Sequence, residues 1–221
     1  MKENTFYDAG YIQFSDDSTI GLCKKLLHLI DSLPKHSWTQ VIRANGITAD
    51  YPLLPRDERI DKKHQIAQEE AAAGLFSYSF AWVADSEENA RLAQWIQVKE
   101  LLLSPPVVQM IAARTGQSIS KIDIVYANCF REGDFLTTHT DRAEHSKIAA
   151  AFSLTESWDP LDGGCTYILK QDRESVLDVV NPSLGCILLL DLSNKEVPHY
   201  VSEVKKKGDS FLRKSMIVRY S

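Results

Sequence analysis

A succession of short predicted strands fills the second half of the chain and constrains its fold more than any other feature of the sequence. After Gly116, short runs of β-branched and aromatic residues are separated by Gly, Pro, Asn and Asp. Many short strands at this spacing are typical of a barrel or a double-sheet sandwich. The predicted strands cover 122–130, 135–139, 148–154, 166–170, 186–190, 199–204 and 213–220.

The first half of the chain has mainly the pattern of helices. Residues 16–33 carry apolar side chains at helical spacing, begin with Asp and Ser cap residues, and end before Pro34. We expect a strand over 76–81, where aromatic residues alternate with small ones, and a loop around Asn45-Gly46. The predicted helices cover 16–33, 57–73, 86–103 and 107–114.

These elements predict an α+β fold: a double-stranded β-helix, that is, a jelly-roll or cupin-like barrel, buttressed by N-terminal helices. The 221 residues suffice for one well-buried domain and are few for two. We therefore expect a single domain over 1–221. Residues 1–116 would form mainly helical support and a substrate lid, and residues 117–221 would form the jelly-roll core with the metal site discussed next.

Composition and charge narrow the choice of partner. The formal charge of −5 gives no basic surface, which argues against a nucleic-acid partner. No apolar run approaches the roughly 20 residues that span a bilayer, and the N-terminus lacks the apolar core of a signal peptide. We expect no membrane partner and a cytoplasmic location. The four scattered cysteines form no CxxC pair and predict buried thiols. The oligomeric state stays open.

The strongest chemical signal is the segment His139-Thr140-Asp141. In an extended chain, residues i and i+2 project from the same face, so one strand can offer an imidazole and a carboxylate to one metal ion. By itself this pattern is weak, because a His-x-Asp pair on a protein surface is common. Two further features give it weight.

His199 is a second candidate imidazole, in a predicted strand much later in the chain. Two His and one carboxylate form the facial triad that leaves open positions on iron(II). Arg213 and Ser215 follow, again at i and i+2, and an Arg fork with a hydroxyl is suited to binding a carboxylate. We therefore predict a metal site and, beside it, a carboxylate site.

The order of these motifs resembles the iron(II)/2-oxoglutarate dioxygenases of the prolyl-4-hydroxylase-like group. The resemblance spans 122–220 and is carried by NCFREGDFLTTHTD, SLTESWDPLDGGCTYIL and NPSLGCILLLDLS, followed by HYVSEV and RKS. It implies iron(II), 2-oxoglutarate as co-substrate and dioxygen. It also implies that His139, Asp141 and His199 are the catalytic metal ligands, and that Arg213, assisted by Ser215, binds the distal carboxylate of 2-oxoglutarate.

One departure concerns the 2-oxoglutarate site. The family often has a Tyr where this sequence has Phe130, and the hydroxyl of that Tyr helps to hold 2-oxoglutarate. Tyr126 or Asn128, on the same predicted strand, could replace it. Arg219 shares a strand face with Arg213 and is a second candidate for the carboxylate, although its terminal position favours a surface role.

Three residues near the motifs are candidates for contact with the substrate: Glu132, Arg142 and Trp158. Glu132 and Arg142 flank the His-x-Asp segment and could bind a zwitterion. Trp158 lies in a turn with Gly163-Gly164, whose glycines would permit positive backbone angles or a close approach near the site.

The predicted reaction is hydroxylation of an unactivated C–H bond. Asp141 occupies the position that a related halogenase leaves open for chloride, so halogenation is disfavoured, whereas desaturation or cyclisation would need no different ligands. The expected substrate is a small molecule, a free amino acid or related metabolite. The alternatives are a prolyl or other side chain in a protein, and a non-catalytic jelly-roll module that binds metal. A zinc hydrolase would also use two His and a carboxylate.

Overall fold

The computed structural model describes residues 6–53, 58–141, 145–205 and 213–221. The strands are β1 Tyr11–Phe14, β2 Thr39–Ala44, β3 Ile47–Pro52, β4 Tyr78–Ala84, β5 Ile122–Phe130, β6 Phe135–His139, β7 Ile148–Ser153, β8 Thr166–Leu169, β9 Val176–Val180, β10 Ile187–Asp191, β11 His199–Val201 and β12 Arg213–Tyr220. The helices are α1 Phe6–Ala9, α2 Asp17–Asp31, α3 Glu58–Ala72, α4 Ala93–Leu102 and α5 Pro105–Thr115, with 3-10 turns η1 Lys35–Ser37, η2 Asn89–Arg91 and η3 Pro160–Asp162.

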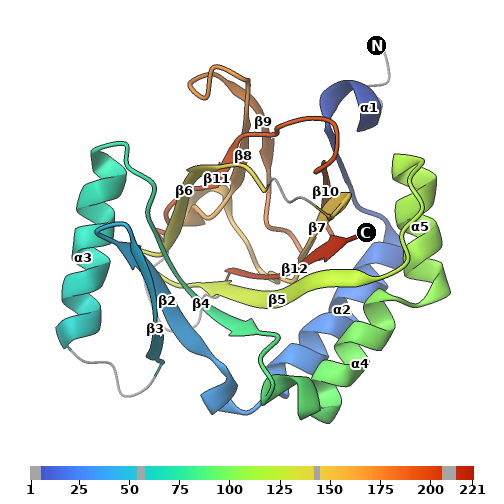
Figure 1. The fold of residues 1–221 in the computed structure, drawn as a ribbon, viewed down its shortest axis with the longest axis horizontal. Helices are drawn as coiled ribbons and strands as arrows, with labels where there is room; N and C mark the ends of the chain where they lie inside the picture. Colours follow the sequence, from blue (N-terminus) through green and yellow to red (C-terminus); the bar gives the residue numbers. More distant parts are fainter. Residues whose placement is uncertain (1–5, 54–57, 142–144, 206–212) are drawn as a thin grey trace.

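The strands form a single antiparallel sheet that rolls into a nearly closed barrel (Figure 1). Along the barrel the order is β1-β10-β7-β12-β5-β4-β6-β11-β8-β9, and β2 and β3 extend the sheet from the free edge of β4. The predicted α+β jelly-roll fold is therefore confirmed. None of the helices in the described ranges is long and apolar enough to cross a membrane.

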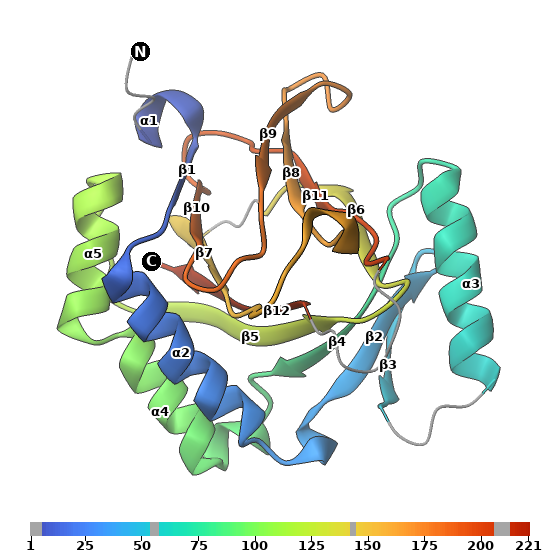
Figure 2. The same ribbon diagram turned by 180° about the vertical axis from the view of Figure 1, so that it is seen from behind.

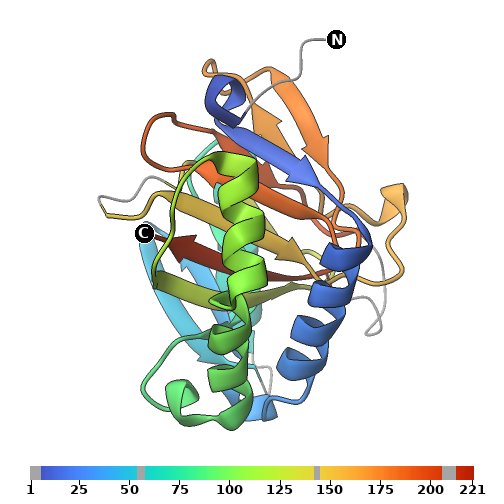
Figure 3. The ribbon, with the colours of Figure 1, turned by 90° about the vertical axis from the view of Figure 1, so that its right-hand side faces the viewer.

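The outer face of the sheet carries the main apolar core. Helices α2, α4 and α5 cover this face together, as the view from behind and the side view show (Figures 2 and 3). Met216 and Val218 of β12 lie in one buried cluster with Trp95 of α4 and Ile111 of α5. The Tyr220 hydroxyl also donates to the Leu102 carbonyl of α4. Helix α3 packs separately, against β2 and β4 on the other side of the molecule.

The inner face of the same sheet is different in character, because alternate residues of a strand point to opposite faces. On β12, Arg213, Ser215 and Arg219 lie on the face opposite to Met216 and Val218. The register with β5 places Asn128 opposite Ser215, and the register with β7 places a small residue, Ala149, opposite Arg219. Polar groups on β12 and β5 thus meet inside the barrel.

The structure corrects parts of the predicted element map. The strands predicted over 122–130, 135–139 and 213–220 have the same bounds in the structure, and residues 6–116 are mainly helical, as expected. The first half nevertheless contributes three strands that were not predicted, β1, β2 and β3. Strand β9 in the second half was not predicted either. Helix α4 begins at Ala93 rather than at residue 86.

The predicted loop around Asn45-Gly46 is a tight hairpin turn. Asn45 and Gly46 have φ values of 55° and 71°, and the flanking residues pair from Ala44 with Ile47 to Thr39 with Pro52. Positive φ at both central residues is the geometry of the two-residue turn that Asn-Gly favours. The Asn-Gly pair was therefore a hairpin signal, and the polar side chains of β3 concealed the strand.

A buried carboxylate organises the turn between β5 and β6, which delivers His139 to the interior. Asp134 accepts from the backbone N–H of Arg131 at 2.9 Å, from Ser79 at 3.0 Å and from Gln40 at 3.1 Å. His64 of α3 hydrogen-bonds with Ser79 at 2.8 Å. The network joins the turn to β2, β4 and α3, and burial raises the pKa of Asp134 to about 6.

This raised pKa predicts a pH dependence of stability. At pH values between the pKa of Asp134 in the unfolded chain and its pKa in the folded protein, the folded protein binds the proton more tightly. The contribution of Asp134 to the unfolding free energy is therefore largest below the unfolded-state pKa and is lost as pH rises through the folded-state pKa. We expect the unfolding free energy of wild type relative to Asp134→Asn to fall by about 2 kcal/mol between about pH 4.5 and about pH 7.5 in urea titrations. Glu174→Gln, at an exposed position, is the control. A difference that does not change with pH would contradict this role of Asp134.

Candidate metal centre

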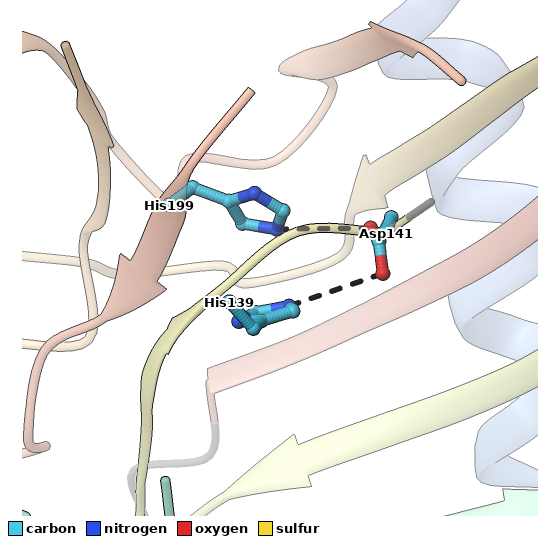
Figure 4. Close-up of side chains that lie close together, drawn as sticks. All are labelled: His139, Asp141 and His199. Atoms are coloured by element: carbon cyan, nitrogen blue, oxygen red, sulfur yellow. Dashed lines mark ion pairs between the residues drawn. The ribbon is translucent and has the colours of Figure 1, made fainter. Parts of the chain in front are cut away.

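The pairing of β6 with β11 brings the two predicted imidazoles together. His139 is the last residue of β6 and His199 the first of β11, and the two occupy paired positions in the register. Their ring centroids lie 4.2 Å apart. Asp141, two residues beyond β6, points toward both rings (Figure 4). Its Oδ1 lies 3.9 Å from His139 Nε2 and its Oδ2 lies 3.6 Å from His199 Nε2.

Hydrogen bonds to the backbone determine which ring nitrogens face the centre. His139 Nδ1 lies 3.0 Å from the Thr137 carbonyl oxygen, and His199 Nδ1 lies 2.8 Å from that of Val197. A carbonyl oxygen can only accept, so each Nδ1 carries the proton. In the neutral form of either ring, the Nε2 atom then presents a lone pair toward the centre. Burial, followed by the proximity of His199, lowers the pKa of His139 to about 4, which keeps its ring neutral.

The donor set fits a metal ion. One ligand atom from each of His139, Asp141 and His199 lies within 4.8 Å of the other two. Burial alone would favour the neutral acid, but His199, His139 and Arg219 outweigh it and hold the pKa of Asp141 below its usual range. With both rings neutral, the two imidazole lone pairs and the ionised carboxylate would repel one another. A cation at their centre removes that repulsion, and two His with one carboxylate suit iron(II).

A buried guanidinium lies at the inner end of β12. Arg213 donates from Nε to the Gly164 carbonyl at 3.0 Å, from one terminal nitrogen to Ser215 Oγ at 2.9 Å and from the other to Thr166 Oγ1 at 3.2 Å. All three acceptors are neutral, and within the described ranges no carboxylate pairs with Arg213. Burial lowers the pKa of Arg213 to about 10, so the group remains charged at neutral pH.

Aromatic stacking holds this guanidinium from one side. The carbon at the centre of the guanidinium lies 4.6 Å from the centroid of the Phe130 ring, which in turn stacks on Phe80 at 4.9 Å. Phe130 lacks the hydroxyl expected at this position, but it provides a cation–π contact. The Ser215 hydroxyl donates to Asn128 Oδ1 at 2.6 Å, which completes a chain from Arg213 to Asn128.

A single cavity joins the predicted triad to Arg213. Its wall is largely apolar, with a few polar groups. Besides His139, Asp141, His199 and Arg213, the lining includes Tyr126, Asn128, Thr166, Leu136, Ala149, Ala151, Leu188, Leu190, Val201 and Ile217. A larger and more open groove between β8, β9 and residues 192–197 contains none of the triad residues. The cavity that contains the triad also holds titratable groups with perturbed pKa values, and it is the better candidate for a functional site.

The structure places the other predicted site residues as follows. Tyr126 and Asn128 line the cavity, as their strand predicts. Glu132 is exposed in the turn between β5 and β6, and Trp158 donates its indole N–H to the Gly163 carbonyl. Neither Glu132 nor Trp158 is among the lining residues, so their contact with substrate stays a prediction. Arg142 lies outside the described residues.

Two contacts of the site were not predicted. Strand β8, which pairs with β11, brings Thr166 within hydrogen-bond distance of Arg213. A single Thr in a predicted strand does not indicate which residue it will contact. Gly164 contributes its carbonyl and has a φ of 70°, and a Cβ there would lie 3.3 Å from Arg213 Cγ. The predicted close approach of Gly163-Gly164 near the site is thus confirmed.

Arg219 differs from its expected surface role. Its side chain is only 21% exposed and donates to Asp141 Oδ1 at 2.8 Å. The i, i+2 alternation from Arg213 already placed Arg219 on the inner face. The terminal position of the residue was a poor guide, because β12 runs through the centre of the sheet up to its last residues.

The chain is similar to one protein-family model and to several solved structures. Residues 125–214 match the model of the 2OG-Fe(II) oxygenase superfamily. A 2OG-Fe(II) oxygenase family oxidoreductase from Burkholderia pseudomallei has a similar structure, with 14% identity over 98% of this chain and 87% of that one and a TM-score of 0.66. No curated protein sequence matches significantly.

Two prolyl hydroxylases are also structurally similar. The enzyme from Trichoplax adhaerens, solved with a hypoxia-inducible-factor peptide fragment, is 14% identical over 98% of this chain and 86% of its own, with a TM-score of 0.55. The prolyl-4-hydroxylase from Pseudomonas putida is 20% identical over 88% and 97%, with a TM-score of 0.47. The matches to the Burkholderia pseudomallei and Trichoplax adhaerens structures, with TM-scores above 0.5, indicate a shared fold and, at 14% identity, the fold alone.

The geometry predicts how metal binding responds to mutation. Calorimetric titration with manganese(II), a redox-stable substitute for iron(II), should show affinity losses of roughly 100-fold or more for His139→Ala, Asp141→Ala and His199→Ala, since each removes a donor. His28→Ala, on the exposed side of α2, is the matched control and should bind like wild type. Unchanged affinity in His199→Ala would show that the metal binds elsewhere.

Proposed function

We propose that this chain, a 2-oxoglutarate/iron(II)-dependent oxygenase of the superfamily whose model it matches, hydroxylates an unactivated C–H bond of a free amino acid or a related small metabolite. The observation that carries the proposal is one cavity lined both by a His-Asp-His cluster and by a buried Arg that lacks an anionic partner within the described ranges. Such a pair of sites suits a co-substrate with a carboxylate at one end and a metal-chelating group at the other.

His139, Asp141 and His199 would hold iron(II) on one face and leave its remaining positions open. Iron(II) with 2-oxoglutarate supplies the activation of dioxygen that hydroxylation requires. The imidazoles are kept in the ligating tautomer by the Thr137 and Val197 carbonyls. These second contacts orient the rings, and they make Nε2 the coordinating atom.

Arg213 would bind the distal carboxylate of 2-oxoglutarate. The groups around it act as its positioning partners: Ser215 and Thr166 hold its terminal nitrogens and Phe130 supports its face. Because the acceptors are neutral, the described residues leave the positive charge of the guanidinium uncompensated in a largely apolar cavity. A carboxylate compensates that charge, and a bidentate Arg–carboxylate pair is strong in such surroundings.

The apolar side chains of the cavity have a separate role. Leu136, Leu188, Leu190, Val201 and Ile217 surround the space between the cluster and Arg213. They would exclude water from the reacting centre, which strengthens the electrostatic contacts and protects reactive species from side reactions.

The alternative substrate is a prolyl or other side chain within a protein. It is supported by the Trichoplax adhaerens neighbour, which was solved with a peptide fragment.

We propose a cytoplasmic location for the reaction. The free thiols of the cysteines at 23, 129, 165 and 186 support this location, because disulfides are rare in reducing compartments.

An anaerobic absorbance titration tests the proposed chemistry. Iron(II) followed by 2-oxoglutarate should produce a weak visible charge-transfer band in wild type and none in His139→Ala. Arg213→Met should raise the 2-oxoglutarate concentration at half-saturation by roughly 10- to 100-fold, since it removes charged hydrogen bonds.

Lys214→Met is the matched control for this titration. Lys214 is the next residue of β12, and its side chain pairs with Asp31 of α2, away from the cavity. It should bind 2-oxoglutarate like wild type. Absence of the band in wild type at saturation would overturn the proposed chemistry. Equal binding by Arg213→Met would overturn the assignment of the carboxylate site.

A second measurement separates the two substrate classes. Aerobic consumption of 2-oxoglutarate should rise when one of the common free L-amino acids is added, if the small-molecule proposal is correct. Stimulation by proline-containing peptides but by no free amino acid would transfer the assignment to the protein-substrate alternative.

A further inference from the structure

Arg219 presents a second cation at the candidate metal centre. It lies on the inner face of β12, six residues beyond Arg213, and one of its terminal nitrogens donates to Asp141 Oδ1 at 2.8 Å. The Nε–H of Arg219 is buried, yet it has no hydrogen-bond partner among the described residues. A buried donor without a partner is rare in folded proteins and calls for a specific explanation.

The surroundings of Arg219 do not satisfy this donor. Its neighbours across the sheet are Ile124 on β5 and Ala149 on β7, both apolar. Within the described part of the chain its one acidic partner is Asp141, which accepts a single hydrogen bond. A guanidinium has five N–H donors, so the group retains capacity for a further acceptor beside the predicted metal position.

2-Oxoglutarate does not account for that capacity. Along an extended strand, six residues separate the Cα atoms of Arg213 and Arg219 by about 20 Å. A five-carbon diacid held by Arg213 at its distal end and by the metal at its other end has no carboxylate left for Arg219. The Nε–H of Arg219 is therefore open to an acceptor from a different molecule.

The charge balance of the loaded site favours an anion there. Among the described residues that line the cavity, the ionised groups are Asp141 and Arg213, and Arg219 adds its charge at the edge. With iron(II) and 2-oxoglutarate bound, the positive charges exceed the negative ones by one. In a cavity of low polarity, this excess attracts a singly charged anion.

We propose that Arg219 binds a carboxylate of the substrate, so that the enzyme acts on molecules with a free carboxylate, and this inference rests on the proposed function. The carboxylate takes the Nε edge of the guanidinium, while the terminal nitrogen keeps its contact with Asp141. The anchored substrate then presents a C–H bond close to the metal. A free amino acid meets this requirement, whereas a residue inside a protein chain has no backbone carboxylate to offer.

The test uses the folded protein loaded with zinc(II) and saturating 2-oxoglutarate, followed by ¹⁵N NMR of the arginine Nε–H groups. Arg219→Lys identifies the Arg219 signal by its loss. Acetate should shift this signal in a saturable manner, whereas acetamide, of the same shape but neutral, and chloride at matched ionic strength should not. The Arg213 Nε–H, which already donates to Gly164, is an internal reference and should not move.

Substrate turnover provides a second readout. For each acid that stimulates 2-oxoglutarate consumption, the corresponding carboxamide should not. Arg219→Met should raise the KM for that acid by about 10-fold or more, and Arg219→Lys should retain part of the affinity, since charged hydrogen bonds are lost or weakened. The KM for 2-oxoglutarate, measured in the same variants, separates substrate binding from damage to the co-substrate site.

The outcomes distinguish this inference from the proposed function. If the charge-transfer band forms in wild type but acetate leaves the Arg219 signal unmoved, or acetamide moves it equally, the carboxylate anchor is overturned and the oxygenase assignment stands. If the band does not form, the proposed function itself has failed.

Discussion

The antiparallel pairing of β6 with β11 is the constraint on which the rest of the site depends. It sets His139 opposite His199, with ring centroids 4.2 Å apart. The register shifts directly after His199, where the pairing moves to Val201 and Leu136. A register displaced by one residue would turn one imidazole to the other face of the sheet. The strand pairing therefore determines whether the two imidazoles can share an ion.

One sheet serves two environments. The outward residues of β12 and β7, such as Met216 and Phe152, pack against the helices in the main core. The inward residues of the same strands line the cavity. Because the side-chain period of a strand is two, burying the outward set against α2, α4 and α5 also determines which residues face inward. The packing of the helices on the outer face thus determines that Arg213 and Ser215 face the site.

The two inward arginines of β12 differ in their electrostatic surroundings. Arg213 is held only by neutral oxygens, from Gly164, Ser215 and Thr166, and its full charge remains for a ligand. Arg219 donates a hydrogen bond to the Asp141 carboxylate, which is also a predicted ligand of the metal. Their placement near opposite ends of one strand provides the two anion sites that we propose, one at Arg213 in the cavity and one at Arg219 beside Asp141. This separation suits an enzyme that binds a co-substrate and a substrate together.

The sequence by itself determined the elements with strong local signals. The strands 122–130 and 213–220, the N-terminal cap of α2 and the motif residues 139, 141, 199, 213 and 215 were all readable, because strand composition, helix capping and motif spacing are local properties. These sufficed for the barrel fold and for the set of residues that could hold a metal.

Only the tertiary structure decided which strands meet. The partnership of Thr166 with Arg213, the hairpin of β2 and β3 against β4, and the contact of Arg219 with Asp141 all join segments distant in sequence. Such contacts depend on register across the sheet, for which a single strand carries no local signal. Arg219 illustrates the difference. The direction of its side chain followed from alternation along β12, whereas its pairing with Asp141 depends on the position of the chain just after β6 in the folded protein.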